Sequence, residues 1–105
     1  MITYEIAKAL FDYDPKTGMV TWKFGSAQIV KGEEIGTSTG TAKSNTKYRS
    51  IKLFGLSYKV HRIIWLMQTG DWPKGDVDHI DGDGLNNKWD NLRDVTHSQN
   101  LMNSA

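Results

Sequence analysis

The sequence predicts a small α+β domain whose last third forms a strand, a long loop, a second strand and a helix. Three observations support this prediction. The 105 residues suffice for one modest domain. The hydrophobic content of 38% indicates a packed core rather than a disordered chain. Short runs with helical or strand periodicity are separated by turns rich in Gly, Asn and Asp. We therefore expect one domain over 1–105, with N-terminal elements over 1–70 and the strand–strand–helix unit over 76–105.

The N-terminal elements are predicted from local signals. Residues 2–11 have the apolar spacing of a short helix, with Thr3 as its N-cap. The stretch "DYDPKTG" predicts a turn that closes at Gly18. Residues 19–24 alternate like a strand. We therefore expect a helix, a turn and a strand in this order.

The middle of the chain predicts a hairpin followed by a helix. Residues 25–45 are uninformative, except that 33–38 indicate a short strand. Residues 47–60 read as a β-hairpin that turns at Phe54-Gly55. The stretch "HRIIWLMQTGDWP" predicts a helix from about residue 61 that ends at Gly70. Its inward-facing residues are predicted to be Ile64, Trp65 and Met67.

The C-terminal third predicts two short strands and a helix. The strands fall on "DVDHI" and near "NLRDV", with an Asp-, Gly- and Asn-rich loop between them. "THSQNLMNSA" begins with Thr96 and has Gln99 three residues later, which is a capping-box pattern. A final helix is therefore expected from about residue 97.

Charge and composition limit the location and the partners. Six bases and no acid lie between residues 41 and 62, whereas seven aspartates lie between 71 and 94. The basic segment suits a polyanion, and the acidic segment would repel one unless a cation lies between them. There is no cysteine, and no apolar run approaches the ~20 residues that a membrane-spanning helix needs. The N-terminus lacks the apolar block of a signal peptide. We expect a cytoplasmic location and no membrane partner.

The strand–strand–helix unit predicts a metal-dependent site. Folding the helix across the strands would bring Asp78 and Asn100 together, and their oxygens suit Mg²⁺ or Mn²⁺ more than Zn²⁺. His79 would lie close to the metal as a general base for water. Neighbouring strand residues point to opposite faces, so Asp78 and His79 share a pocket only if the strand ends or twists there. A solvated turn is the alternative. An EF-hand calcium loop is disfavoured because Asn86 occupies the sixth position counted from Asp81.

The segment "VDHIDGDGLNNKWDNLRDVTHSQN" resembles the HNH endonucleases, also called ββα-metal or His-Me finger nucleases. It is most similar to the branch found in phage and homing enzymes. The consensus positions are filled by His79, Asp81, Gly82, Asn86, Asn87, Asn91, Leu92, Thr96 and Asn100. The stretches "YKVHRIIW" and "LFDYDPKTGMVTWK" are similar to the family as well.

The resemblance implies a fold and a set of roles. The C-terminal unit would be the ββα-metal motif, packed on the N-terminal hairpin and helix region. Asp78 and Asn100 would bind one divalent metal, Mg²⁺ or Mn²⁺, and His79 would be the general base. Asn91 would hold the loop and help to orient the base. Many family members end the motif in histidine, so Asn100 argues against zinc.

The implied activity is hydrolysis of DNA to 5′-phosphate and 3′-hydroxyl ends, with nicking expected from one such site. A non-catalytic DNA-binding module on the same fold is the alternative, and a homodimer or a phage protein would be a further partner. The resemblance also implies a bacterial or phage-infected host cell and no small-molecule substrate. Expected contacts to the DNA backbone come from Arg49, Lys52, Lys59, Arg62 and Arg93. His61 is interpreted as structural. The sequence ends five residues after Asn100, and without a further recognition region we expect weak sequence discrimination.

Overall fold

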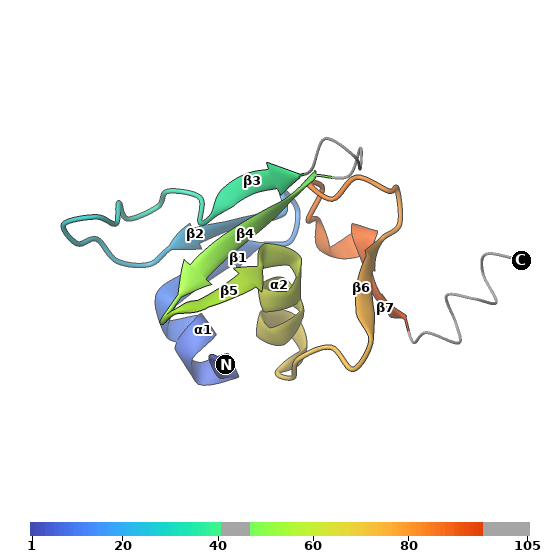
Figure 1. Ribbon diagram of the computed structural model, residues 1–105, viewed down its shortest axis with the longest axis horizontal. Helices are drawn as coiled ribbons and strands as arrows, with labels where there is room; N and C mark the ends of the chain where they lie inside the picture. Colours follow the sequence, from blue (N-terminus) through green and yellow to red (C-terminus); the bar gives the residue numbers. More distant parts are fainter. Residues whose placement is uncertain (41–46, 96–105) are drawn as a thin grey trace, which may run out of the picture.

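Antiparallel β-pairs surround a central helix in the computed structural model, which describes residues 1–40 and 47–95 (Figure 1). The helices are α1 (Tyr4–Leu10), α2 (Val60–Thr69) and the short 3₁₀ helix η1 (Trp89–Asn91). The strands are β1 (Phe11–Asp14), β2 (Met19–Trp22), β3 (Thr37–Gly40), β4 (Lys47–Leu53), β5 (Leu56–Lys59), β6 (Asp76–His79) and β7 (Leu92–Val95). They form a β1–β2 pair, a β3–β4–β5 sheet and a β6–β7 pair. The predicted α+β class is confirmed for this part of the chain.

The N-terminal segment forms a helix that leads directly into a hairpin. The Thr3 side chain accepts a hydrogen bond from the Ile6 amide, so the predicted cap is confirmed. The turn closes where Gly18 donates to the Asp14 carbonyl. The sequence prediction missed β1, because this four-residue strand follows α1 without a turn and alternates its aromatic residues with aspartates. The hairpin buries Phe11 and Val20 in the core.

The predicted hairpin of residues 47–60 is confirmed as β4 and β5. Leu53 pairs with Leu56 across the turn at Phe54 and Gly55, whose φ angles of 51° and 80° are those of a two-residue hairpin turn. The third strand, β3, pairs with β4 on its other edge. The sequence had indicated only a short strand at 33–38 here.

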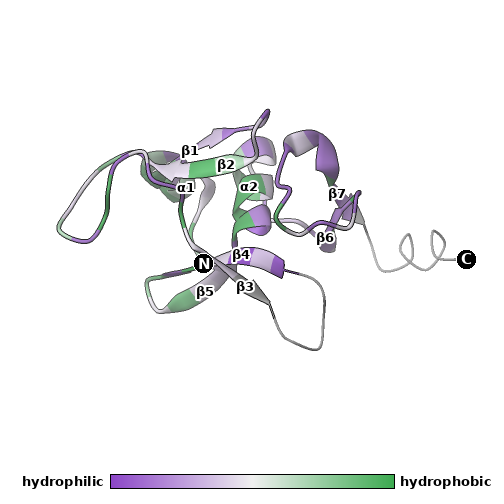
Figure 2. Ribbon diagram, turned by 90° about the horizontal axis from the view of Figure 1, so that it is seen from above, coloured by the Kyte–Doolittle hydropathy of each residue, from purple (hydrophilic) through white to green (hydrophobic). Residues whose placement is uncertain are grey.

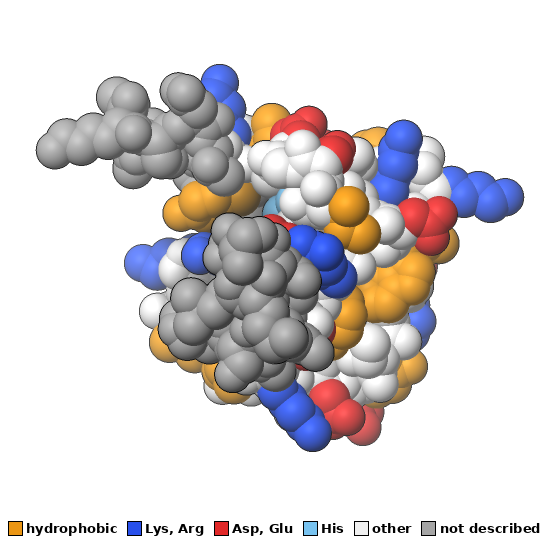
Figure 3. Space-filling view, turned by 90° about the vertical axis from the view of Figure 1, so that its right-hand side faces the viewer, with side chains coloured by type: hydrophobic (Ala, Val, Ile, Leu, Met, Phe, Trp, Pro, Cys, Tyr) orange, Lys and Arg blue, Asp and Glu red, His pale blue; other side chains and the backbone are white. Residues whose placement is uncertain are grey.

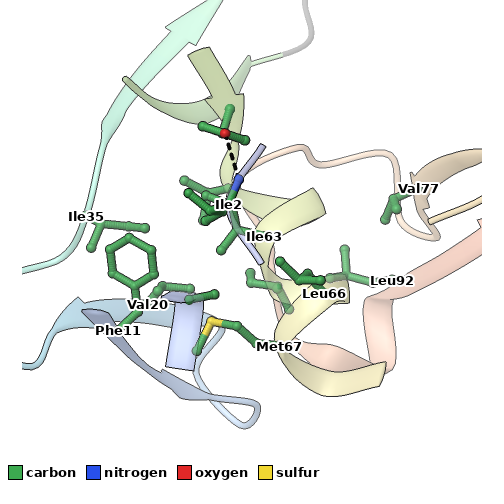
Figure 4. Close-up of a cluster of buried hydrophobic side chains, with 13 residues drawn as sticks. Ile2, Phe11, Val20, Ile35, Ile63, Leu66, Met67, Val77 and Leu92 are labelled. Atoms are coloured by element: carbon green, nitrogen blue, oxygen red, sulfur yellow. Dashed lines mark hydrogen bonds between the residues drawn. The ribbon is translucent and has the colours of Figure 1, made fainter. Parts of the chain in front are cut away.

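Helix α2 is the central element of the core (Figure 4). Ile63 and Ile64 are fully buried, and Leu66 and Met67 nearly so. The helix ends at Gly70, which has a left-handed conformation, as predicted. The inward prediction is confirmed for Ile64 and Met67, whereas Trp65 is only half-buried and packs on Trp89. No helix in the described ranges is long and apolar enough to cross a membrane.

The β6–β7 pair lies on one side of α2, opposite α1 and the other strands (Figure 1). Val77 and Leu92 turn into the shared core, while hydrophilic residues dominate the connection between the two strands (Figure 2). Both strands occur where they were predicted, with Asp78 opposite Arg93 and His79 opposite Leu92. Asn91 ends η1 just before β7 instead of beginning the strand. The predicted final helix lies outside the described residues.

Arg49 serves the fold, although we expected it to contact DNA. Its guanidinium donates to the carbonyls of Ile35 and Gly36 at 2.7–3.1 Å and lies 3.5 Å from a Glu34 carboxylate oxygen. The Arg49 side chain is 21% exposed. A charged donor that already satisfies carbonyls inside the protein is poorly placed for phosphate. The alternation in β4 explains the difference, because Arg49 shares the inward face with Ile51.

We predict that Arg49→Met destabilises the protein by about 1–3 kcal/mol, because the two carbonyls lose their charged donor. Lys52→Met is the matched control, since Lys52 lies exposed on the same strand. Chemical denaturation measures both variants. Equal stability of the two variants would contradict the structural role of Arg49.

Candidate active site

A polar hollow of about 380 Å³ lies between the start of α2, the β4–β5 hairpin and the end of β6. Its lining comes from separate parts of the chain: Tyr48, Lys59, His61, Val77, Asp78, His79, Gly82 and Gly84. On the β6–β7 side of the molecule, acidic and basic side chains lie near a small exposed area of histidine (Figure 3). The hollow therefore brings carboxylate, imidazole and ammonium groups together.

Asp78 and His79 are sequence neighbours, yet both line this hollow. Strand β6 ends at His79, and the Gly82 amide donates to the His79 carbonyl at 2.9 Å to form a turn. Side chains alternate between the two faces of a continuing strand. Because β6 ends at His79, Asp78 and His79 can both reach the hollow. This was the condition under which both residues could serve one site.

His79 is oriented by a buried asparagine. Its Nε2 lies 2.9 Å from Oδ1 of Asn87, which is 2% exposed. An amide oxygen accepts a hydrogen bond, so this contact places the imidazole proton on Nε2. In the neutral imidazole the lone pair is then on Nδ1, which is the form a general base requires.

A second histidine packs against the first. The rings of His61 and His79 meet at 75° with their centroids 4.8 Å apart. His61 is 8% exposed, and its Nδ1 has no hydrogen-bond partner in the part of the chain that is described. Burial, with smaller contributions from His79, Lys59 and Arg62, lowers the pKa of His61 to about 3. His61 is therefore neutral at ordinary pH and confines the His79 ring without adding charge.

Asp78 forms an ion pair with Arg93 across the β6–β7 pair. Nε and Nη2 of Arg93 donate to the same carboxylate oxygen, Oδ2, at 3.0 and 2.8 Å. The two side chains are 38% and 44% exposed, so the pair contributes only ~0–1 kcal/mol. Arg93, which we expected to contact DNA phosphate, thus lies at the site and is bonded to Asp78, the expected metal ligand.

Asn91 organises the loop that follows His79. Its side chain accepts from the Asp81 amide at 3.0 Å and donates to the Asp81 carboxylate and to the Asn86 carbonyl. Asp81 also accepts from the Asn86 side chain and the Asp83 amide. These hydrogen bonds, that of Asn86 first, lower the pKa of Asp81. Asn91 therefore holds the loop, whereas the hydrogen-bond partner of His79 is Asn87.

Gly84 lets the loop touch the β4 strand. A Cβ at this position would lie 2.0 Å from the Lys47 carbonyl oxygen, so only glycine permits the approach. The loop and the hairpin thereby form adjacent walls of the hollow. The sequence had suggested only a turn-forming role for Gly84.

The other expected DNA contacts are dispersed. The Lys59 ammonium lies 5.1 Å from the centre of the Tyr48 ring, at the hollow. Lys52 is exposed on β4. Arg62 lines a different, more apolar hollow with Tyr58 and Trp72. Lys59 and Arg93 are therefore the expected contacts that the structure brings to His79 and Asp78.

Among the residues that line the hollow, Asp78 supplies the carboxylate that a metal would bind. Within them, no three His, Cys, Asp or Glu side chains form a group that could hold an ion. Arg93 engages only Oδ2 of Asp78, and a hard carboxylate oxygen suits Mg²⁺ or Mn²⁺. Asn100, the other expected ligand, lies outside the described residues.

The sequence alone does not reveal the contacts of Asn87 and His61 with His79. Asn87 is one consensus position of the motif, eight positions after His79. His61 lies outside the segment that carries this consensus and is predicted to be structural. No local pattern reveals a contact between residues 18 positions apart on a helix and a strand.

Comparison with protein families identifies one match. Residues 58–102 match the family model described as HNH endonuclease. No curated protein and no solved structure matches the chain significantly. The match contains the hollow's residues from α2 and β6 and leaves residues 1–57 outside it.

We predict that His61→Phe removes part of the acid sensitivity of folding. The folded-state pKa of His61 is about 3, below its ordinary value of about 6.5. Between these two pH values the unfolded chain therefore binds a proton at His61 that the native chain does not bind. The contribution of His61 to the free energy of unfolding is thus complete above pH 6.5 and is lost as pH falls toward 3. Between pH 8 and 5 the wild type should lose about 2 kcal/mol more than the variant in urea unfolding. Parallel pH profiles would contradict the buried neutral state.

Proposed function

We propose that the chain is a metal-dependent DNA endonuclease of the HNH endonuclease family, with His79 as general base, because residues 58–102 match the model of that family. One observation carries this proposal. Asp78 and His79 line one polar hollow, and Asn87 holds His79 in the tautomer that leaves Nδ1 free for a proton. The family implies a DNA substrate.

In the proposed reaction, His79 removes a proton from a water that attacks the phosphorus of the scissile phosphodiester. The P–O3′ bond breaks and the leaving 3′ oxygen takes up a proton from water, so the products carry a 5′-phosphate and a 3′-hydroxyl. Asp78 and Asn100 would hold one Mg²⁺ or Mn²⁺ ion, which when bound stabilises negative charge on the phosphate oxygens. One such hollow acts on one strand, so we propose nicking as the elementary event.

Charged side chains around the hollow would bind the flanking DNA backbone. The Lys59 ammonium lies at the hollow over the Tyr48 ring, and the Arg93 guanidinium lies beside Asp78. Lys52 extends this basic surface along β4, because Lys52 pairs with Ser57 and Ser50 pairs with Lys59 on one face of the hairpin. Phosphate contacts of this kind fix register without reading sequence. Arg62 would contact DNA only beyond this surface.

The Asp78–Arg93 ion pair favours a second function, that of a DNA-binding module without catalysis. In that case Arg93 would occupy the carboxylate that a metal requires. The pair is exposed and weak, however, and a divalent cation competes well for a carboxylate whose other oxygen is not shared with Arg93. Cleavage of supercoiled DNA with and without Mg²⁺ or Mn²⁺ decides between the two functions.

We predict that His79→Ala lowers nicking of supercoiled plasmid by about 10²–10⁴-fold, because the attacking water loses its general base. DNA affinity, measured by gel shift in Ca²⁺, and the circular dichroism spectrum should stay as in the wild type. Ile80→Ala is the matched control, since Ile80 is the exposed neighbour at the same strand end. Full activity of His79→Ala would exclude His79 as the base.

We predict that Asp78→Asn raises the Mg²⁺ concentration for half-maximal nicking about tenfold or more, because the site loses its anionic oxygen. The substitution keeps the side-chain shape and an oxygen acceptor for Arg93. Asp76→Asn serves as control on the same strand, where the aspartate is exposed. An unchanged Mg²⁺ requirement in Asp78→Asn would rule out Asp78 as a ligand.

A further inference from the structure

Strand β1 and the turn that follows it are hydrogen-bonded to segment 87–89, where the loop after β6 runs into η1. The Tyr13 hydroxyl donates to the Asn87 carbonyl, and the Trp89 amide donates to the Pro15 carbonyl at 3.1 Å. Burial, followed by the charges of Asp14 and Asp90, raises the pKa of Tyr13, so the phenol keeps the proton that it donates. Tyr13 and Asn87 are 74 positions apart, which makes this a tertiary link.

Gly18 brings the two backbones into direct contact. A Cβ at Gly18 would lie 2.6 Å from the Asn87 carbonyl carbon and from the Lys88 nitrogen. Real Cβ atoms do not approach other atoms this closely, so any other residue at position 18 would displace segment 87–89 or the turn. The turn thus sets where this segment lies.

Asn87 connects this contact to the proposed base. Its backbone carbonyl accepts from Tyr13, while its side-chain Oδ1 faces Nε2 of His79. Hydrogen bonds weaken steeply with distance and angle, so a small shift of the segment weakens the bond that selects the imidazole tautomer. Without that bond the proton can move to Nδ1, and the ring then no longer offers Nδ1 as a base.

We propose that β1 and the β1–β2 turn position the active site: Tyr13 on β1 and Gly18 in the turn hold segment 87–89, and Asn87 sets the tautomer and orientation of His79. This inference deepens the proposed function and rests on it for its effect on cleavage. It also assigns part of the site to residues 1–57, outside the part of the chain that matches the family model.

Gly18→Ala tests the proposal against Gly32→Ala. Both glycines have positive φ angles, 81° and 84°, so both alanines cost similar backbone strain. Only Gly18 faces other atoms, because nothing lies within 4 Å of a Cβ at Gly32. We expect Gly18→Ala to lower turnover about tenfold to a hundredfold, with DNA affinity unchanged, and Gly32→Ala to match the wild type.

A second readout is independent of cleavage. Long-range ¹H–¹⁵N spectra of the imidazoles report the tautomer of His79, whose signals are assigned by their loss in His79→Gln. We expect the Nε2-protonated form in the wild type and in Gly32→Ala, and a mixture of tautomers in Gly18→Ala. If the wild type does not cleave DNA, the proposed function fails, yet these spectra still decide whether the turn positions His79.

Tyr13→Phe covers the outcome that Gly18→Ala does not fold. It removes one hydroxyl and keeps the ring. Tyr58→Phe is its matched control, because the Tyr58 hydroxyl accepts from the Ile2 amide, away from segment 87–89. Tyr13→Phe should shift the His79 tautomer and lower turnover, and Tyr58→Phe should do neither. The proposal is overturned if Tyr13→Phe, or a folded Gly18→Ala, leaves the spectra and turnover equal to those of its control.

Discussion

Burial of helix α2 is the constraint on which the rest of the structure depends. Its residues Ile63, Ile64 and Leu66 are almost fully enclosed, and the helix contacts α1, β4, β5 and β6. A two-stranded β-pair is at best marginally stable in water, and among the β6–β7 residues whose burial is described, Val77 and Leu92 enter the core. These strands therefore keep their geometry because α2 supports them. The same helix begins beside the hollow, where its first turn places His61 against His79.

The apolar core fixes where the strands lie, but polar contacts fix how His79 points. His61 limits the ring from the α2 side, and Asn87 bonds to Nε2 from the loop side. Asn87 is in turn held by Tyr13 of the N-terminal hairpin. Three segments that are distant in sequence thus converge on one imidazole. Such preorganisation costs stability, since the Nδ1 atom of His61 remains buried without a partner among the described residues.

Local signals were sufficient for much of this fold. The Phe54-Gly55 turn, the end of α2 at Gly70 and the places of β6 and β7 each follow from residues within a few positions of one another. The contacts that assemble the site are not local. The sequence indicates a surface base at Arg49, whereas in the structure Arg49 donates to the carbonyls of Ile35 and Gly36. Nothing near Tyr13 in the sequence indicates its hydrogen bond to Asn87. The alternation of side chains along a strand predicts the face on which a residue lies, but not which distant backbone groups it contacts on that face.

The structure also reduces the conflict between an acidic segment and the proposed polyanionic substrate. Hydrogen bonds from the loop already surround the carboxylate of Asp81, and Asp94 accepts from the amides of Lys74 and Gly75. Arg93 neutralises Asp78, and Lys59 adds a positive charge at the hollow. Because a paired carboxylate presents little net field, the charge that faces an approaching phosphate is more positive than the composition of residues 71–94 suggests. Asp81 therefore serves to build the loop, and Asp78 at the hollow is paired with the cation Arg93.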